Sequence, residues 1–235
     1  MLDASIARIE SDLADDALVL DVGGWAKPLH RADWVLDLMP YETRGLYGNG
    51  PDSSAERFNA DTWICRDICD REPWPFHDNQ FDFVACSHTL EDIRDPIFVC
   101  SELNRVARAG YVEVPSRLVE QALGVHGPWV GWSHHRWLVD RERDGLRFVA
   151  KPHLLQARIE AQFPPQFPAT LSEEEKVVSL FWKDGFEYRE HIFFDQDLDV
   201  YLVNFVRDHM DAELAPHPAP RRRRERLSDL LARRR

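Results

Sequence analysis

Short apolar runs, each followed closely by an acidic residue, recur through the first half of the chain. The runs at 18–20, 34–36 and 63–65 are each short enough to form a strand buried on both faces of a sheet. Only a short segment containing Pro28 separates the first two strands, so a helix there must be very short or missing. The alternation predicts an α/β fold. We expect strands at 17–22, 33–38, 62–66, 81–86 and 110–115, helices at 3–14 and about 96–107, and a loop rich in Gly, Asn, Pro and Ser at 45–55.

Three aspartates, Asp21, Asp37 and Asp67, lie at or just beyond the C-terminal ends of the first three predicted strands. In an open α/β sheet this edge is where ligands bind. Gly23 and Gly24 follow the first strand and allow backbone N–H groups to approach a ligand closely. An acid that ends the second strand can accept both hydrogen bonds of a ribose diol. The three acids are therefore spaced as an adenosine cofactor requires.

A longer series of motifs follows, and it supports a more specific interpretation. In chain order it reads Asp67-Ile68, Trp74-Pro75-Phe76, Asp78-Asn79-Gln80-Phe81-Asp82, Ser87-His88-Thr89-Leu90-Glu91-Asp92, Asp95-Pro96, Glu102, Arg105-Val106, Gly110 and Val114-Pro115. Together with the glycine turn, this series resembles the class I S-adenosylmethionine-dependent methyltransferases, especially the methyltransferase type 11-like group. The resemblance covers roughly residues 16–116. It implies a Rossmann-like, mostly parallel sheet with an antiparallel edge hairpin.

The resemblance also implies S-adenosylmethionine as the cofactor and suggests roles for individual residues. Asp37 resembles the acid that holds the ribose diol, and Asp67 with Ile68 resembles the pair that faces the adenine. Ser87 and His88 resemble the wall beside the methionine moiety. These roles suit the side chains, because carboxylates accept from hydroxyls and amines and Ile packs on a flat ring. The expected cofactor-binding residues are Asp21, Gly23, Gly24, Trp25, Asp37, Leu38, Asp67, Ile68 and Ser87.

Two positions depart from the pattern of the resembling proteins. Trp25 stands where their turn usually carries a glycine. Its ring could clash with the methionine tail, lie against the sulfonium in a cation–π contact, or pack outward, and the sequence leaves these alternatives open. Asp92 stands where relatives often carry His, which puts a proton-transfer role of that position in doubt.

Beyond residue 115 the resemblance ends. Residues 135–151 and 177–194 each place Asp-Gly at a predicted hairpin turn, and we expect the second hairpin to complete the sheet as its antiparallel edge. The first lies in an insertion that we expect to cover the strand ends as a substrate lid. The predicted parts are a cofactor-binding core (1–115), the lid (116–170), the rest of the sheet with a closing helix (171–214), and a tail rich in Pro and Arg (215–235).

The start of the insertion is rich in His and Trp: His126, Trp129, Trp132, His134, His135 and Trp137. A neutral imidazole can remove a proton from an acceptor near pH 7, and Trp faces can stack on a sugar or an aromatic ring. The candidate catalytic residues are His88, His134 and His135, each with a structural role as the alternative. Glu113, in the last parallel strand, either points into the site or pairs with Arg117.

Composition and charge narrow the classes of function. The chain has 235 residues, with 44% apolar residues and no secretory signal or long apolar run, which predicts a soluble, cytoplasmic protein without a membrane span. Eight arginines against one Glu and one Asp give the last fifteen residues a net charge of +6. Since the whole chain carries −12, the first 220 residues carry −18. A surface this acidic repels phosphate backbones, which disfavours a nucleic-acid substrate. The arginine-rich tail is either solvated or a contact for an anionic surface or partner. The four cysteines, Cys65, Cys69, Cys86 and Cys100, indicate core positions, and we expect no metal site in the protein.

Taken together, the sequence favours an enzyme that methylates a small molecule, with oxygen preferred as the acceptor atom and a sugar or natural product as the acceptor class. An inactive methyltransferase-like protein that serves as a partner or scaffold is the main alternative. A nicotinamide-dependent oxidoreductase is disfavoured because the segment after the first strand lacks the GxGxxG turn that binds a pyrophosphate. The sequence leaves open whether the protein is a homodimer.

Overall fold

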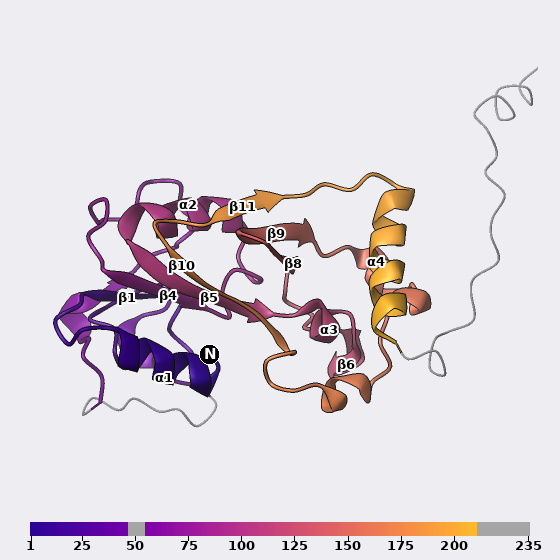
Figure 1. Ribbon diagram of the computed structural model, residues 1–235, viewed down its shortest axis with the longest axis horizontal. Coiled ribbons are helices and arrows are strands. Elements are labelled where there is room, and N and C mark those ends of the chain that lie inside the picture. The colour runs from indigo at the N-terminus through magenta and orange to yellow at the C-terminus, as the bar shows by residue number, and fades with distance from the viewer. Residues whose placement is uncertain (47–54, 211–235) are drawn as a thin grey trace, which may run out of the picture.

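A computed structural model describes residues 1–46 and 55–210 and has a six-stranded sheet at its centre (Figure 1). The strand order is β10-β5-β4-β1-β2-β3, in which β1 to β5 run parallel and β10 is antiparallel to β5. The mostly parallel α/β sheet expected from the sequence is therefore confirmed. Its strands are β1 (Val19–Val22), β2 (Trp34–Asp37), β3 (Trp63–Cys65), β4 (Phe83–Ser87), β5 (Ala109–Pro115) and β10 (Val177–Lys183).

Both faces of this sheet are buried, because side chains alternate between the faces along each strand. Leu20 and Val84 belong to the core that also contains residues of helix α2 (Pro96–Val106). Their neighbours Val19 and Phe83 pack on the opposite face with Ile9 of helix α1 (Asp3–Asp12). The two helices therefore cover opposite faces and leave the C-terminal edge of the sheet open to a ligand.

No helix lies between β1 and β2, as the sequence predicted. The connection is instead held by Asp21, whose Oδ2 accepts a hydrogen bond of 2.8 Å from the backbone N–H of Leu29. Gly23 begins the turn with φ +76°, and a Cβ atom there would stand 2.1 Å from Oγ1 of Thr89. Only glycine satisfies both the backbone angle and the close contact.

The hairpin expected at 135–151 is confirmed as β8 (Trp137–Glu142) and β9 (Gly145–Ala150), which pair antiparallel. The hairpin expected at 177–194 is wrong. β10 forms the antiparallel edge of the main sheet, but β11 (Glu187–Glu190) pairs in parallel with β9 in a separate three-stranded sheet.

The side chain of Asn104 explains why the chain does not fold back after the Asp184-Gly185 turn. Its amide nitrogen donates to the carbonyl of Phe186 at 2.8 Å, and its amide oxygen accepts from the N–H of the same residue at 3.2 Å. Phe186 and Tyr188 then pack with the core around α2. Helix α2 thus directs the chain toward β9 and away from β10.

The remaining elements gather beside β8 and β9, at the right of Figure 1. Leu202 of helix α4 (Gln196–His209) belongs to one buried cluster with Leu138, Val149 and Leu155, and Val206 belongs to another with Phe163. The second half of the chain thus builds its own small cores next to the main sheet. These elements are α3 (Arg117–Glu120), β6 (Leu123–His126), β7 (Trp129–Val130) and α4 (Gln196–His209).

Two segments discussed from the sequence lie outside the described residues: most of the loop at 45–55, and the tail at 215–235. In the part of the chain that the structure covers, no helix combines the length and apolarity needed to cross a bilayer.

Candidate functional site

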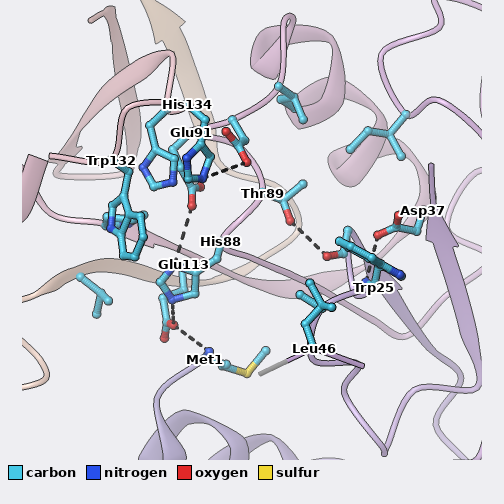
Figure 2. A pocket seen from close by; sticks show the side chains of 18 of the residues that line it. Met1, Trp25, Asp37, Leu46, His88, Thr89, Glu91, Glu113, Trp132 and His134 are labelled. Atoms are coloured by element: carbon cyan, nitrogen blue, oxygen red, sulfur yellow. Dashed lines mark hydrogen bonds and ion pairs between the residues drawn. The ribbon is translucent and has the colours of Figure 1, made fainter. Parts of the chain in front are cut away.

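A cavity of about 750 Å³ lies at the C-terminal edge of the sheet (Figure 2). Its wall is shared by the strand ends and by residues of the segment 116–170, with Glu173, Lys176 and Val177 at the start of β10. A volume of this size is typical of small-molecule sites. Of the predicted site residues, the cavity brings together Gly23, Trp25, Asp37, Leu38, Asp67, Ile68, His88, His134 and His135. Asp21, Gly24 and Ser87 do not line it.

Asp37 ends β2 and is almost fully buried at one end of the cavity. Its Oδ2 accepts from the backbone N–H of Trp25 at 3.0 Å, and its Oδ1 accepts from that of Met39 at 2.8 Å. Burial raises the pKa of this carboxyl, although both N–H groups act to lower it. Each carboxylate oxygen has a second lone pair, so Asp37 can still accept from a ligand's hydroxyls.

The indole of Trp25 lies at the same end of the cavity as Asp37 (Figure 2). Its Nε1 donates to the carbonyl of Thr43 at 2.7 Å and lies 3.0 Å from the Oγ1 of that residue, which belongs to the short helix η1 (Tyr41–Thr43). These bonds fix the ring beside the residues expected to hold ribose. His88 lies further along the cavity in the same view.

Leu38, Asp67 and Ile68 continue the wall at the Asp37 end. Leu38 is 62% exposed, which leaves an apolar surface available for a flat ring. Asp67 forms an ion pair with Arg94 and accepts from the N–H of Cys69 at 2.9 Å. Burial would raise the pKa of Asp67, but the hydrogen bond from Arg94, supported by that from Cys69, lowers it. Asp67 is thus an anion beside an apolar surface.

Asp21 has a structural position in the turn below the cavity. It is 3% exposed, and burial raises its pKa to about 7 against the opposing hydrogen bond from Leu29. A Cβ atom on Gly24 would stand 2.2 Å from Oδ2 of Asp21, so this glycine makes room for the carboxyl. Both residues stabilise the turn and do not line the cavity, whereas the sequence suggested that they contact the cofactor.

His88 follows β4 and has the left-handed φ of 52°. Its Nε2 lies 3.0 Å from Oε1 of Glu113, and its Nδ1 lies 3.7 Å from Oε1 of Glu91. Burial would lower the pKa of His88, but the hydrogen bonds to Glu113 and Glu91 raise it to about 9. His88 is therefore an imidazolium at neutral pH, so it is poorly suited to the role of neutral base expected from the sequence.

Glu113 points into the site and does not pair with Arg117, which binds Asp140 at 3.2 Å. Its carboxylate accepts from the N–H of Leu2 at 2.9 Å and from the hydroxyl of Tyr111. Burial would raise its pKa, but the hydrogen bonds from His88, Tyr111 and Leu2 together lower it to about 2. The pair Glu113 and His88 is thus ionised on both sides at neutral pH.

Glu91 is a cavity residue to which the sequence analysis gave no role. Its side chain is 2% exposed, and its Oε2 has no hydrogen-bond partner among the described residues. A buried carboxylate oxygen without a partner costs free energy, so such a group indicates a ligand, an ion or water at the site. The resemblance placed Glu91 inside a motif, but only the fold shows that its side chain faces the cavity.

His134 and His135 come from the loop between β7 and β8 and meet Asp92 from the turn after β4. Nε2 of His134 lies 3.9 Å from Oδ2 of Asp92. Nδ1 of His135 lies 2.8 Å from Oε1 of Glu120, whose Oε2 lies 2.7 Å from Nζ of Lys151. Figure 2 places His134 near Glu91 on the wall opposite Trp25. Two distant parts of the sequence thus supply one polar cluster.

Comparison with known proteins agrees with this geometry. Residues 49–112 match the family model of a methyltransferase domain. The matched segment contains β3, β4, α2 and the first part of β5, and so includes Asp67, His88 and Glu91. A methyltransferase domain with a sheet of this kind implies S-adenosylmethionine as the cofactor. No curated protein matches the sequence.

Several solved structures are similar to about half of the chain. A SAM dependent methyltransferase from Aquifex aeolicus is 16% identical, over 48% of this chain and 64% of that one, with a TM-score of 0.34. The YcgJ protein from Bacillus subtilis is 16% identical, over 49% of this chain and 52% of that one, with a TM-score of 0.38. The [4+2]-cyclase SpnF is 18% identical, over 49% of this chain and 45% of that one, with a TM-score of 0.37. The chain thus spans less than two thirds of each of these structures, and likenesses this distant carry no conclusion about its activity.

Proposed function

We propose that this protein transfers the methyl group of S-adenosylmethionine to an oxygen atom of a small molecule. The observation that carries the proposal is the cavity itself. It joins Asp37 and Asp67, expected to face the nucleoside, to a second wall formed by Trp132, His134 and His135. One cavity therefore has room for both a cofactor and an acceptor.

The residues at the first end fit the cofactor. Asp37 offers acceptor lone pairs for a ribose diol, and exposed Leu38 offers an apolar surface for adenine. Among the described residues, six carboxylates line the cavity: Asp37, Asp67, Glu91, Asp92, Glu113 and Glu173. Three of these six form close ion pairs: Glu173 with Lys176, Glu113 with His88, and Asp67 with Arg94. Asp37, Glu91 and Asp92 remain as the acidic part of the wall. The acidic wall suits a cationic ligand, and bound S-adenosylmethionine supplies a methyl group activated by its sulfonium charge.

The segment 116–170 is our candidate for the acceptor-selecting lid. Trp132 is 36% exposed and offers an aromatic face, which suits a sugar or phenol ring. His134 and His135 lie beside it as candidate proton acceptors, since His88 is already protonated. In the reaction, the acceptor oxygen would gain the methyl group and lose its proton.

The decisive experiment is calorimetric titration of the full chain with S-adenosylmethionine and with its demethylated product. We expect both to bind, followed by methyl transfer in a screen of sugars and phenols. His134→Ala combined with His135→Ala should lower turnover or raise the acceptor's KM and leave cofactor affinity nearly unchanged. His77→Ala, at an exposed histidine outside the cavity, is the matched control. Failure of both cofactor forms to bind would refute the proposal.

A second candidate is a methyltransferase-like protein without turnover that serves as a binding partner or scaffold. The observation that favours it is Trp25, whose ring is tied to Thr43 in the space beside Asp37. This candidate predicts that Trp25→Gly improves the binding of both cofactor forms. Tight binding by the unmodified protein, together with turnover of any acceptor, would exclude it.

A further inference from the structure

Asp92, His134 and His135 each place one potential ligand atom within 4.8 Å of the other two. The 3.9 Å between Nε2 of His134 and Oδ2 of Asp92 is too long for a hydrogen bond. Two ligands about 2.1 Å from one tetrahedral ion stand about 3.4 Å apart. The separation of this pair is thus within about half an ångström of that required by a shared metal ion, and the two pairs that include His135 lie within 4.8 Å.

The contacts of His135 prepare one of its ring nitrogens for coordination. Glu120 is paired with Lys151, and an ionised carboxylate only accepts hydrogen bonds. In the neutral form of the ring, Nδ1 therefore carries the proton of its 2.8 Å bond to Glu120, and the lone pair available to a metal ion is on Nε2. A carboxylate behind a histidine is a common support for histidines that bind metals.

Aromatic neighbours fix the orientation of both rings. The ring of Trp132 lies 5.8 Å from that of His134 and 5.9 Å from that of His135. The two imidazoles themselves stand nearly perpendicular, with centroids 4.6 Å apart. The cluster is therefore held in place without a hydrogen bond between its members.

A second, independent observation comes from Glu91, which precedes Asp92 and lines the same cavity. Its buried Oε2 lacks a partner among the described residues. A cation or its bound water nearby would supply the missing interaction. The four cysteines take no part, since none lines the cavity.

We propose that Asp92, His134 and His135 bind a first-row divalent transition-metal ion. Two imidazoles and one carboxylate favour Zn²⁺, Fe²⁺ or Co²⁺ over Mg²⁺ and Ca²⁺, which prefer oxygen ligands only. Three protein ligands leave coordination positions open, and all three residues line the cavity. Metal binding stands apart from methyl transfer, but the role of the ion rests on the proposed function: it would hold the acceptor oxygen and make its proton easier to remove. With the ion bound, this effect would replace direct proton uptake by His134 and His135, whose lone pairs would then be coordinated.

The test is calorimetric titration of the untagged full chain with Zn²⁺, and optical titration with Co²⁺, whose visible absorption reports its ligands. We expect one ion per chain. Asp92→Asn and His134→Ala, at partly exposed positions that the fold tolerates, should each weaken binding at least tenfold. His153→Ala and Cys65→Ser, at exposed positions outside the cavity, are the matched controls.

Binding that is absent, or equally strong in the variants and the controls, would overturn the metal site. The same preparations are titrated with S-adenosylmethionine, so that the two proposals can fail separately. Metal binding without cofactor binding supports the ion site and refutes the proposed transfer. Cofactor binding without metal binding does the reverse.

Discussion

Replacing His88 with Asn tests the ion pair at the centre of the cavity. His88 has a left-handed backbone, which Asn tolerates better than most residues, so the substitution removes the imidazole with little added strain. The groups that face the imidazole are the carboxylates of Glu113 and Glu91, and the amino group of Met1 lies 3.2 Å from Glu113. The two carboxylates stabilise the charged ring, and the variant loses that interaction.

The size of the effect follows from the pKa of His88, which rises from 6.5 to about 9 on folding. A rise of this size corresponds to about 3.4 kcal/mol before solvent screening. The ring is 45% exposed, so screening reduces the contribution to roughly 1 kcal/mol. Because the folded pKa is the higher one, this stability is fully present below pH 6.5 and is lost as the pH rises through 9.

The assay is urea unfolding of the wild type and His88→Asn at pH 6 and pH 9.5. We expect the wild type to be more stable than the variant at pH 6, and the difference to shrink by roughly 1 kcal/mol at pH 9.5. Glu113, whose pKa is lowered to about 2, stays ionised throughout and does not contribute to the change. His77→Asn, at an exposed histidine, should show no such trend. A difference between wild type and His88→Asn that is independent of pH would refute the reasoning.

Three further substitutions test the turn and the nucleoside end. Asp37→Ala should weaken cofactor binding at least about tenfold in calorimetry, and should also lower the unfolding free energy because two N–H groups lose their acceptor; unchanged affinity would remove this acid from the site. Trp25→Gly should change the affinities for S-adenosylmethionine and its neutral product by the same factor, since Thr43 holds the ring beside Asp37; a selective loss of the cationic form would place the ring at the sulfonium. The unfolding free energy of Asp21→Asn, relative to that of the wild type, should be higher at pH 8 than at pH 4 by on the order of 1–3 kcal/mol. The reason is that the raised pKa of about 7 makes the wild type lose stability as the pH rises from 3.8; parallel stability profiles would contradict this.

The main sheet was predicted well because the features that determine it lie close together along the chain. Each buried strand is a short apolar run, and the Gly23 turn is dictated by one backbone angle and one close contact. The direction of β11 could not be predicted in this way. It depends on Asn104, which lies 82 positions before Phe186 along the chain, and the Asp184-Gly185 turn looks the same whether or not a hairpin follows.

Most of the predicted site residues line one cavity, and their roles toward a cofactor stay predictions, whereas their charge states could not be derived from the sequence. The motifs indicated His88 as a neutral base, yet its charge depends on Glu113 and Glu91, which the fold brings to both ring nitrogens. Asp21 was expected at the cofactor, but its side chain turns back to Leu29. Pairings of this kind arise from tertiary contacts, which spacing along the chain does not encode.

The path of the chain after Gly185 limits how the molecule can move. β11 pairs with β9 in parallel, and the side chain of Asn104 in α2 forms two hydrogen bonds with the backbone of Phe186. A swing of the whole segment 116–170 away from the main sheet would have to break either the ladder between β9 and β11 or the hydrogen bonds between Asn104 and Phe186. The loop at 131–136 is tied down as well, because Lys151 donates to the carbonyl of Trp132 at 2.9 Å and the N–H of Arg136 donates to the carbonyl of Glu91 at 2.7 Å. Among the described residues, opening this wall of the cavity therefore requires hydrogen bonds to break, and we expect ligand exchange there to be slower than the motion of an unattached loop.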